Sequence, residues 1–312
     1  MNAPVRKFEA VPMDDAPEPL SIGLIGPPGG GKTKSALRIA DGMARVRGGD
    51  VVVLDTERRA RKYRQSHSFK WVPIEPPFKS EHFIEAIREW DRPDVAAIIV
   101  DSMSDEHEGE GGHLAWHDEE MANKSTGGNA WAAWSKPSAS RRKFKTGFLR
   151  VMTPLIFTFR AREKTIQVGK EIKNIGFVPV APIEIVHNLD LTCILPPNAN
   201  GKPVWKSDKM GEEFFIKNPD YLRHCITAGQ IDEAMGEALA RWASGTPDPH
   251  AADRAAGLAA AGKGVAALKS WWDIVPKAAR KALAPYLDGT LKPMAAEVDA
   301  RMAGSAATGD VE

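Results

Sequence analysis

The chain has 312 residues, of which 43% are hydrophobic and 27% are charged, and its formal net charge is +1. This composition is typical of a globular protein with a sizeable core. A charge so close to zero excludes attraction of nucleic acid by the overall field, so any such surface must be a local cluster. The two cysteines, Cys193 and Cys225, are far apart in the sequence, which excludes a disulfide framework and suits a reducing compartment. No apolar run approaches the ~18–20 residues of a membrane span, so we expect a cytoplasmic protein without a membrane partner.

Residues 21–34 combine an apolar run, a glycine-rich loop and the start of an amphipathic helix. The run Ile22–Ile25 predicts a strand buried on both faces. The next eight residues match G-x-x-x-x-G-K-[ST], a phosphate-binding loop: Gly26, Pro27, Pro28, Gly29, Gly30, Gly31, Lys32 and Thr33. Glycines let the backbone N–H groups surround phosphate oxygens, and the following helix adds its positive end. We expect Lys32 to contact the β- and γ-phosphates, Thr33 to ligate Mg²⁺ and Lys34 to border the nucleotide, so ATP and Mg²⁺ are the predicted ligands.

The chain on either side of this loop reads as alternating strands and helices. Residues 1–20 are rich in proline and acidic side chains and predict a flexible lead-in. A second buried strand is predicted at residues 51–54, a basic run follows at 58–64, and a helix is predicted at 81–90 after a proline-containing loop. A third strand is predicted at 95–100. This alternation predicts an α/β fold with a mostly parallel central sheet flanked by helices.

Two acidic side chains come at the ends of predicted strands. Asp101 closes the third strand, where a carboxylate downstream of a phosphate loop commonly holds the Mg²⁺ shell. Glu57 lies just past the second strand, and if the two strands are neighbours its carboxylate faces the γ-phosphate. It is then a candidate general base, and the alternative is an ion pair with Arg58 or Arg61 on a solvated loop.

At this point the chain resembles the RecA/Rad51-like P-loop ATPases. The string DS-x-S-x-E-x-E-G-x-GG at residues 101–112 and the NAWAAW of Asn129–Trp134 are similar to shortened phage recombinases of the single-strand annealing type. The resemblance covers residues 20–243. It implies that Glu57 is the catalytic glutamate of a Mg²⁺-dependent, DNA-stimulated ATPase. It also implies a homo-oligomeric ring or filament, single-stranded DNA and a single-strand binding protein as partners, and the bacterial host cytoplasm as location if the protein is phage-encoded.

The strand predicted at residues 154–159 carries the cations of the next candidate group. It ends in Thr-Phe-Arg, where many recombinases have Asn-Gln, so the γ-phosphate sensor stays open between Thr158 and Arg160. Arg162 and Lys164 alternate as strand residues would and could share one face. Either they act catalytically on a neighbouring subunit's nucleotide or they lie on a loop paired with Glu163 or Glu171.

Two basic stretches form the predicted DNA surface. The candidate DNA-binding residues are Arg141, Arg142, Lys143 and Lys145, with Lys170 and Lys173 on a glycine-bearing loop predicted at 165–176. Cations would hold phosphates, and Phe144 and Phe148 could stack on unpaired bases. The alternative is that both phenylalanines have helical spacing because they pack in the core, with the cations on the solvent-exposed face of the same helix.

The chain from residue 189 onward predicts the end of the ATPase domain and a separate helical module. A strand is predicted at 189–195, a β-hairpin at Pro203–Phe215 and a helix at 231–242. His113 and His117 have a spacing that a metal could use, although a charged helix face is the favoured interpretation. We therefore predict a lead-in at 1–20, a RecA-like ATPase domain at 21–243, a linker at 244–250, a helical module at 251–303 and a disordered tail at 304–312.

These observations predict a RecA-like ATPase of phage type that acts on single-stranded DNA in recombination or strand annealing. Two alternatives stay open. One is a ring-forming helicase or helicase loader, which would unwind DNA directionally or stimulate another motor. The other is a nucleotide-gated interaction protein with little turnover and no affinity for DNA.

Overall fold

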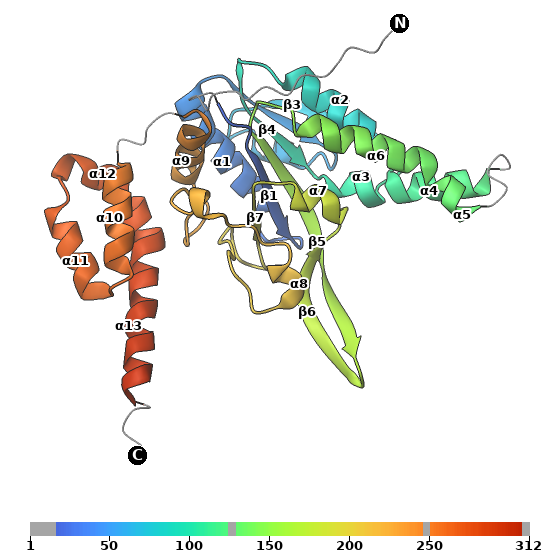
Figure 1. The fold of residues 1–312 in the computed structure, drawn as a ribbon. Coiled ribbons are helices and arrows are strands. Elements are labelled where there is room, and N and C mark those ends of the chain that lie inside the picture. Colours follow the sequence, from blue (N-terminus) through green and yellow to red (C-terminus); the bar gives the residue numbers. More distant parts are fainter. Residues whose placement is uncertain (1–16, 124–128, 246–249, 308–312) are drawn as a thin grey trace, which may run out of the picture.

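A seven-stranded sheet forms the centre of the protein (Figure 1). The structure, a computed structural model, describes residues 17–123, 129–245 and 250–307. The strands are β1 Ser21–Gly26, β2 Asp50–Asp55, β3 Lys70–Pro73, β4 Val95–Asp101, β5 Leu155–Val168, β6 Glu171–Pro179 and β7 Leu191–Ile194. Six of them lie side by side in the order β3-β2-β4-β5-β1-β7, and all of these neighbours are parallel, while β6 pairs with β5 antiparallel. The predicted α/β fold with a mostly parallel sheet is confirmed.

Helices cover both faces of this sheet. They are α1 Lys32–Arg47, α2 Ser80–Trp90, α3 Ser104–Glu108, α4 His113–Ala122, α5 Ala130–Ala133, α6 Ser135–Phe148, α7 Ile183–His187, α8 Met210–Glu213 and α9 Glu233–Ala243, with 3₁₀ turns η1 Ala60–Tyr63 and η3 Asp220–Leu222. Because side chains alternate along a strand, β1 sends Ile22 and Leu24 into the core with α1 and α9, and Ile25 into the opposite core with α2 and α6. This two-sided burial explains the continuously apolar strands.

The strand register brings the ends of β1, β2 and β4 together beside Arg160 of β5 at one edge of the parallel sheet. Asp55 at the end of β2 lies opposite Asp101 at the end of β4. Gly26, where the phosphate loop begins, lies opposite Arg160 of β5. Since the sheet is parallel here, every one of these residues lies at its carboxyl edge, where open α/β sheets bind ligands.

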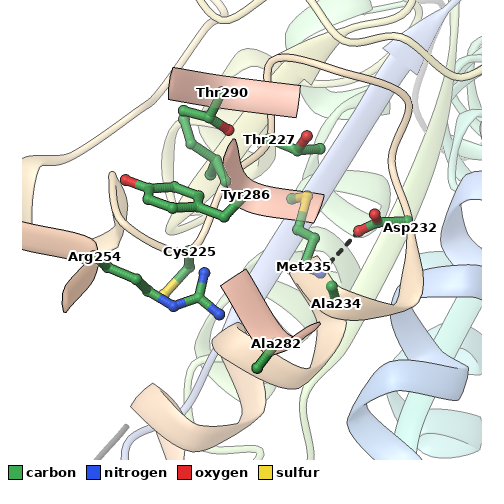
Figure 2. A pocket seen from close by; sticks show the side chains of 10 residues that line it. Cys225, Thr227, Asp232, Ala234, Met235, Arg254, Ala282, Tyr286 and Thr290 are labelled. Carbon is green, nitrogen blue, oxygen red and sulfur yellow. Dashed lines mark hydrogen bonds between the residues drawn. The ribbon is translucent and has the colours of Figure 1, made fainter. Parts of the chain in front are cut away.

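The C-terminal helices have a core of their own. They are α10 Ala251–Ala261, α11 Val265–Ile274, α12 Lys277–Tyr286, the π-helical turn η4 Leu287–Leu291, and α13 Lys292–Ala307. Leu268, Trp271, Leu283 and Leu291 pack together inside them. The Ala228 N–H donates to Thr290 Oγ1 over 3.4 Å, and a cavity of about 20 Å³ next to this contact is lined from both sides (Figure 2). The division into domains stays a prediction, and residues 1–16, 246–249 and 308–312 of the predicted lead-in, linker and tail lie outside the described residues.

Three local predictions were wrong. Strand β3 forms at the sheet edge, within the segment that the sequence predicts as a loop. Residues 165–176 form most of a β-hairpin rather than a loop, with Gly169 in a left-handed turn. Pairing between β5 and β6 defines these strands, and most of their residues are exposed, so no buried apolar run marks them in the sequence. Residues 203–215 are not a hairpin: Val204 makes a single bridge with Ile194, and α8 follows. No described helix is long and apolar enough to cross a membrane.

Candidate nucleotide-binding site

The phosphate loop is held in a conformation that requires glycine. Gly31, directly before α1, has a φ of 94°, in the left-handed region that favours glycine. A Cβ at Gly26 would lie 2.2 Å from the carbonyl oxygen of Leu195, so no side chain fits there. The loop therefore stays open toward solvent on one side and packs tightly against the chain after β7 on the other.

Lys32 begins α1 and lies beside this loop. Its Nζ donates to the carbonyl oxygens of Gly26, over 2.7 Å, and Pro27, over 3.0 Å. Burial lowers the pKa of Lys32, and the nearby carboxylates of Asp101 and Glu57 oppose that shift. An ammonium group held at the mouth of a glycine-rich loop is suited to phosphate oxygens. Lys34 is exposed at the rim of the same cavity.

Asp101 and Thr33 are hydrogen-bonded to each other. Thr33 Oγ1 donates to Asp101 Oδ2 over 2.7 Å, and the Thr158 hydroxyl donates to the other carboxylate oxygen. Asp101 is 5% exposed, and this burial raises its pKa, while the two hydroxyl hydrogen bonds oppose the shift. A hydroxyl and a carboxylate side by side next to a phosphate loop are oxygen ligands that fit Mg²⁺.

Glu57 faces the same cavity from the end of β2. Its carboxylate lies 3.4 Å from Arg160 Nη1 and 3.2 Å from Arg59 Nε. Burial and the charge of Asp101 raise the pKa of Glu57, and both arginines oppose the increase. Strand β2 lies beside β4, as the placement of Glu57 at the cavity required. The alternative ion pair with Arg58 or Arg61 is wrong, because the partners of Glu57 are Arg59 and Arg160.

These residues line one cavity of about 540 Å³ at the carboxyl edge of the sheet. It contains most of the predicted nucleotide and metal residues and five that were not predicted: Arg59, Lys62, Tyr63, Ser102 and Asn200. Arg59 and Lys62 belong to the basic run that the sequence showed without a role. Asn200 had no sequence signal beyond its polar loop, and it has a φ of 48° in a turn where the Gly201 N–H donates to the Gly30 carbonyl oxygen.

Arg160, and not Thr158, reaches into the cavity. Thr158 is buried against Asp101, whereas Arg160 lines the cavity and also pairs with Asp105 over 2.6 Å. Arg162 lies further along β5 and pairs with Glu108 over 2.7 Å. Lys164 is exposed on the same strand. Arg162 and Lys164 therefore lie outside this chain's own cavity, and their action on a neighbouring nucleotide stays a prediction.

The predicted DNA surface is divided in the structure. The prediction that Arg141 contacts DNA is wrong, because its side chain is buried, with 8% exposure, and pairs with Glu106 over 2.9 Å. Phe144 and Phe148 are buried in the core, as the alternative interpretation predicts. Arg142 and Lys143 line a groove of about 480 Å³ together with Glu81 and Glu85. Next to them Lys145 is half-buried on α6, so the basic face of this helix is smaller and more mixed in charge than the sequence indicated.

The other half of that surface is fully exposed. Lys170 forms the turn between β5 and β6, and Lys173 follows on β6, opposite Ile166. Figure 1 shows this hairpin extending well beyond the sheet. Exposed cations on an extended hairpin can meet a polyanion without first breaking a buried ion pair.

The histidines of α4 pack against an aromatic ring. His117 stacks on Trp134 with ring centroids 3.9 Å apart, and His113 lies 5.0 Å from the same ring. Within the described parts of the chain, no group of three or more histidine, cysteine or acidic residues could hold a metal ion. The two rings are part of the packing between α4 and α6.

Because His113 is buried, we expect the free energy of unfolding to decrease as the pH falls below neutral. Burial and the Arg141 charge lower its pKa to about 3, whereas a histidine in the unfolded chain titrates near 6.5. Between these values the unfolded chain binds a proton that the folded protein does not, so the free energy of unfolding falls as the pH drops, by up to about 1.4 kcal/mol per pH unit. A His113→Gln variant should show a smaller decrease between pH 7 and pH 5 in urea denaturation, and the exposed control His187→Gln should follow the wild type. Equal decreases in all three proteins would contradict the assignment.

One protein-family model covers most of the residues of this site. The sequence model of the AAA domain family matches residues 18–195, which include the phosphate loop, Glu57 and Asp101. No curated protein matches the sequence. Among solved structures, a KaiC-like protein from the hyperthermophilic archaeon Pyrococcus horikoshii is similar over 56% of this chain and 88% of its own, at 19% identity and a TM-score of 0.29. Since the family match spans more than half of the chain and includes the cavity, this protein belongs to the AAA domain family of P-loop ATPases.

Proposed function

We propose that this ATPase uses Mg²⁺ and works on single-stranded DNA in recombination or strand annealing, like the phage RecA-like proteins that its motifs resemble. The observation that carries the proposal is the cavity in which Lys32, Thr33, Asp101, Glu57 and Arg160 meet. It supplies a phosphate loop, a pair of metal-binding oxygens, a carboxylate base and a cation, the set that phosphoryl transfer to water needs.

Each side chain has a distinct task in this reaction. Lys32 and the loop N–H groups bind the phosphates, and Thr33 and Asp101 would hold Mg²⁺, which neutralises phosphate charge when bound. Glu57 accepts the proton of the attacking water, for which its raised pKa is suited because a base works best near the ambient pH. Arg160 positions Glu57 and adds positive charge next to the transferred group.

Strand β5 supports a link between this chemistry and DNA. It begins in the core, passes the cavity at Arg160 and continues into the exposed hairpin that carries Lys164, Lys170 and Lys173. A polyanion bound along the hairpin would therefore contact the strand that positions Glu57. Arg162 and Lys164 on the same strand are our candidates for contact with a neighbouring subunit's nucleotide in a ring or filament.

The hairpin lysines give the test of this function. A Lys170→Ala/Lys173→Ala variant should bind single-stranded DNA more weakly at every base sequence, because fewer phosphates are neutralised by cations. The slope of log affinity against log salt should fall by roughly 0.7 for each phosphate that the variant no longer neutralises. The measurement is a titration of a labelled oligothymidylate with wild type and variant, with ATP, at several salt concentrations.

The groove pair Arg142→Ala/Lys143→Ala is the matched control, because it removes the same charge from a surface that also carries glutamates. It should weaken binding less than the hairpin variant. If the wild type shows no binding at low or moderate salt, the DNA function is wrong. The second candidate, a nucleotide-gated interaction protein, would then be favoured, and the buried pairing of Arg141 already points in that direction.

A further inference from the structure

The basic run after β2 is rich in cations, and the reaction above uses only part of it. Five of the seven residues from Arg58 to Arg64 are arginine or lysine, and none is acidic. Arg58 pairs with Glu75, and Arg59 pairs with Glu57 over 3.2 Å. Arg61, Lys62 and Arg64 form no ion pair with any residue that the structure describes. Several positive charges thus remain uncompensated at the carboxyl edge of the sheet.

The 3₁₀ turn η1 separates these cations onto two sides. Lys62 and Tyr63, with Arg59 just before the turn, line the nucleotide cavity. Arg61 and Arg64 line a second cavity of about 300 Å³, whose other walls include His67, Phe69 and Trp71. One short turn therefore faces two adjacent cavities, three residues after Glu57.

The second cavity holds its arginine in a defined position. The Arg61 guanidinium lies over the Trp71 ring, 4.8 Å from the centroid. The Trp71 Nε1–H donates to Asp55 Oδ2 over 2.9 Å, which fixes the ring on the end of β2. His67, on another wall, is hydrogen-bonded to Asp41. A guanidinium stacked on an indole keeps its N–H edge available for bidentate contact with a phosphate.

We propose that this second cavity binds the sugar–phosphate backbone of single-stranded nucleic acid. The inference rests on the proposed function and adds a contact to it, separate from the hairpin. Two arginines without acidic partners among the described residues match phosphodiester charge, and the partly buried rings of Phe69 and Trp71 suit unpaired bases better than a rigid duplex. Because η1 also lines the nucleotide cavity, a strand bound here contacts the turn that follows Glu57 and can promote hydrolysis.

The test compares DNA binding and ATP turnover of an Arg61→Ala/Arg64→Ala variant with the wild type. The variant lacks two phosphate-binding cations, and each contributes about 0.7 to the slope of log affinity against log salt. Oligothymidylate binding should therefore weaken roughly 25-fold at 0.1 M salt, and the slope should fall by about 1.4. Turnover without DNA should stay at the wild-type level, while its stimulation by the oligonucleotide should disappear. Arg61→Lys/Arg64→Lys keeps the charge and should recover most of the salt slope.

The control is Lys277→Ala/Lys281→Ala, which removes the same charge from exposed positions on α12 and should bind DNA as the wild type does. Wild-type affinity and stimulation in Arg61→Ala/Arg64→Ala would overturn this inference and leave the proposed function standing, whereas absence of binding by the wild type would overturn both. Inorganic phosphate that displaces the oligonucleotide at equal ionic strength would show a site for free phosphate instead. A change in sedimentation of the variant without DNA, with DNA affinity unchanged, would show a contact between copies of the chain and would also overturn the inference.

Discussion

A Glu57→Gln variant should bind ATP as the wild type does and lose turnover by roughly 10²–10⁴-fold, the range typical for removal of a general base. The amide has almost the same shape but cannot accept a proton from water. It also keeps an oxygen that can accept from Arg160, which lies 3.4 Å from the carboxylate. The measurement is phosphate release at saturating ATP, together with binding of a fluorescent ATP analogue.

Two controls make this result specific. Lys32→Ala should lose binding as well as turnover, because the phosphates lose a main cationic partner. Glu75→Gln makes the same chemical change at an exposed glutamate that pairs with Arg58 outside the cavity, and its turnover should stay at the wild-type level. Wild-type turnover in Glu57→Gln would remove Glu57 as the base. Glu106 would be a poor replacement, since it is fully buried and paired with Arg141.

An Arg141→Ala variant should lower the free energy of unfolding by about 3–5 kcal/mol, the range for breaking a buried ion pair by removing one partner. Glu106 has an exposed fraction of 0% and receives hydrogen bonds from Arg141 Nε and Nη2 over 3.0 and 2.9 Å. Without the guanidinium, the Glu106 charge would stay buried beside the Ser80 hydroxyl, a neutral donor that compensates it only in part. Urea denaturation with an unchanged m-value would measure the effect.

The adjacent Arg142→Ala is the matched control, because Arg142 is exposed and its removal should change stability by no more than about 0.5 kcal/mol. A double Arg141→Met/Glu106→Gln variant removes both charges and should recover part of the stability. If Arg141→Ala lowers the free energy of unfolding by less than about 1 kcal/mol, well under the range for a buried pair, and weakens DNA binding in a folded protein, Arg141 would be a surface contact after all.

The sequence by itself determined the nucleotide loop and the buried strands around it. These features are local: the loop pattern needs eight adjacent residues, and a strand buried on both faces is apolar throughout, as in β1 and β4. The position of Glu57 beside Asp101 followed from the rule that parallel strands end at one edge, and the register of Asp55 with Asp101 confirms it. The catalytic role of Glu57 stays a prediction.

Only the tertiary structure decided which charged side chains are available at the surface. Arg141 and Arg142 are neighbours in sequence with equal charge, yet one is buried on Glu106 and the other is exposed. Helical periodicity shows that a helix has two faces, but the partner of a buried charge comes from another element, here α3. Asn200 likewise joins the cavity only because β7 lies beside β1, so that the loop after β7 reaches the phosphate loop. Contacts between residues far apart in the chain depend on strand order and packing, and no local pattern contains either.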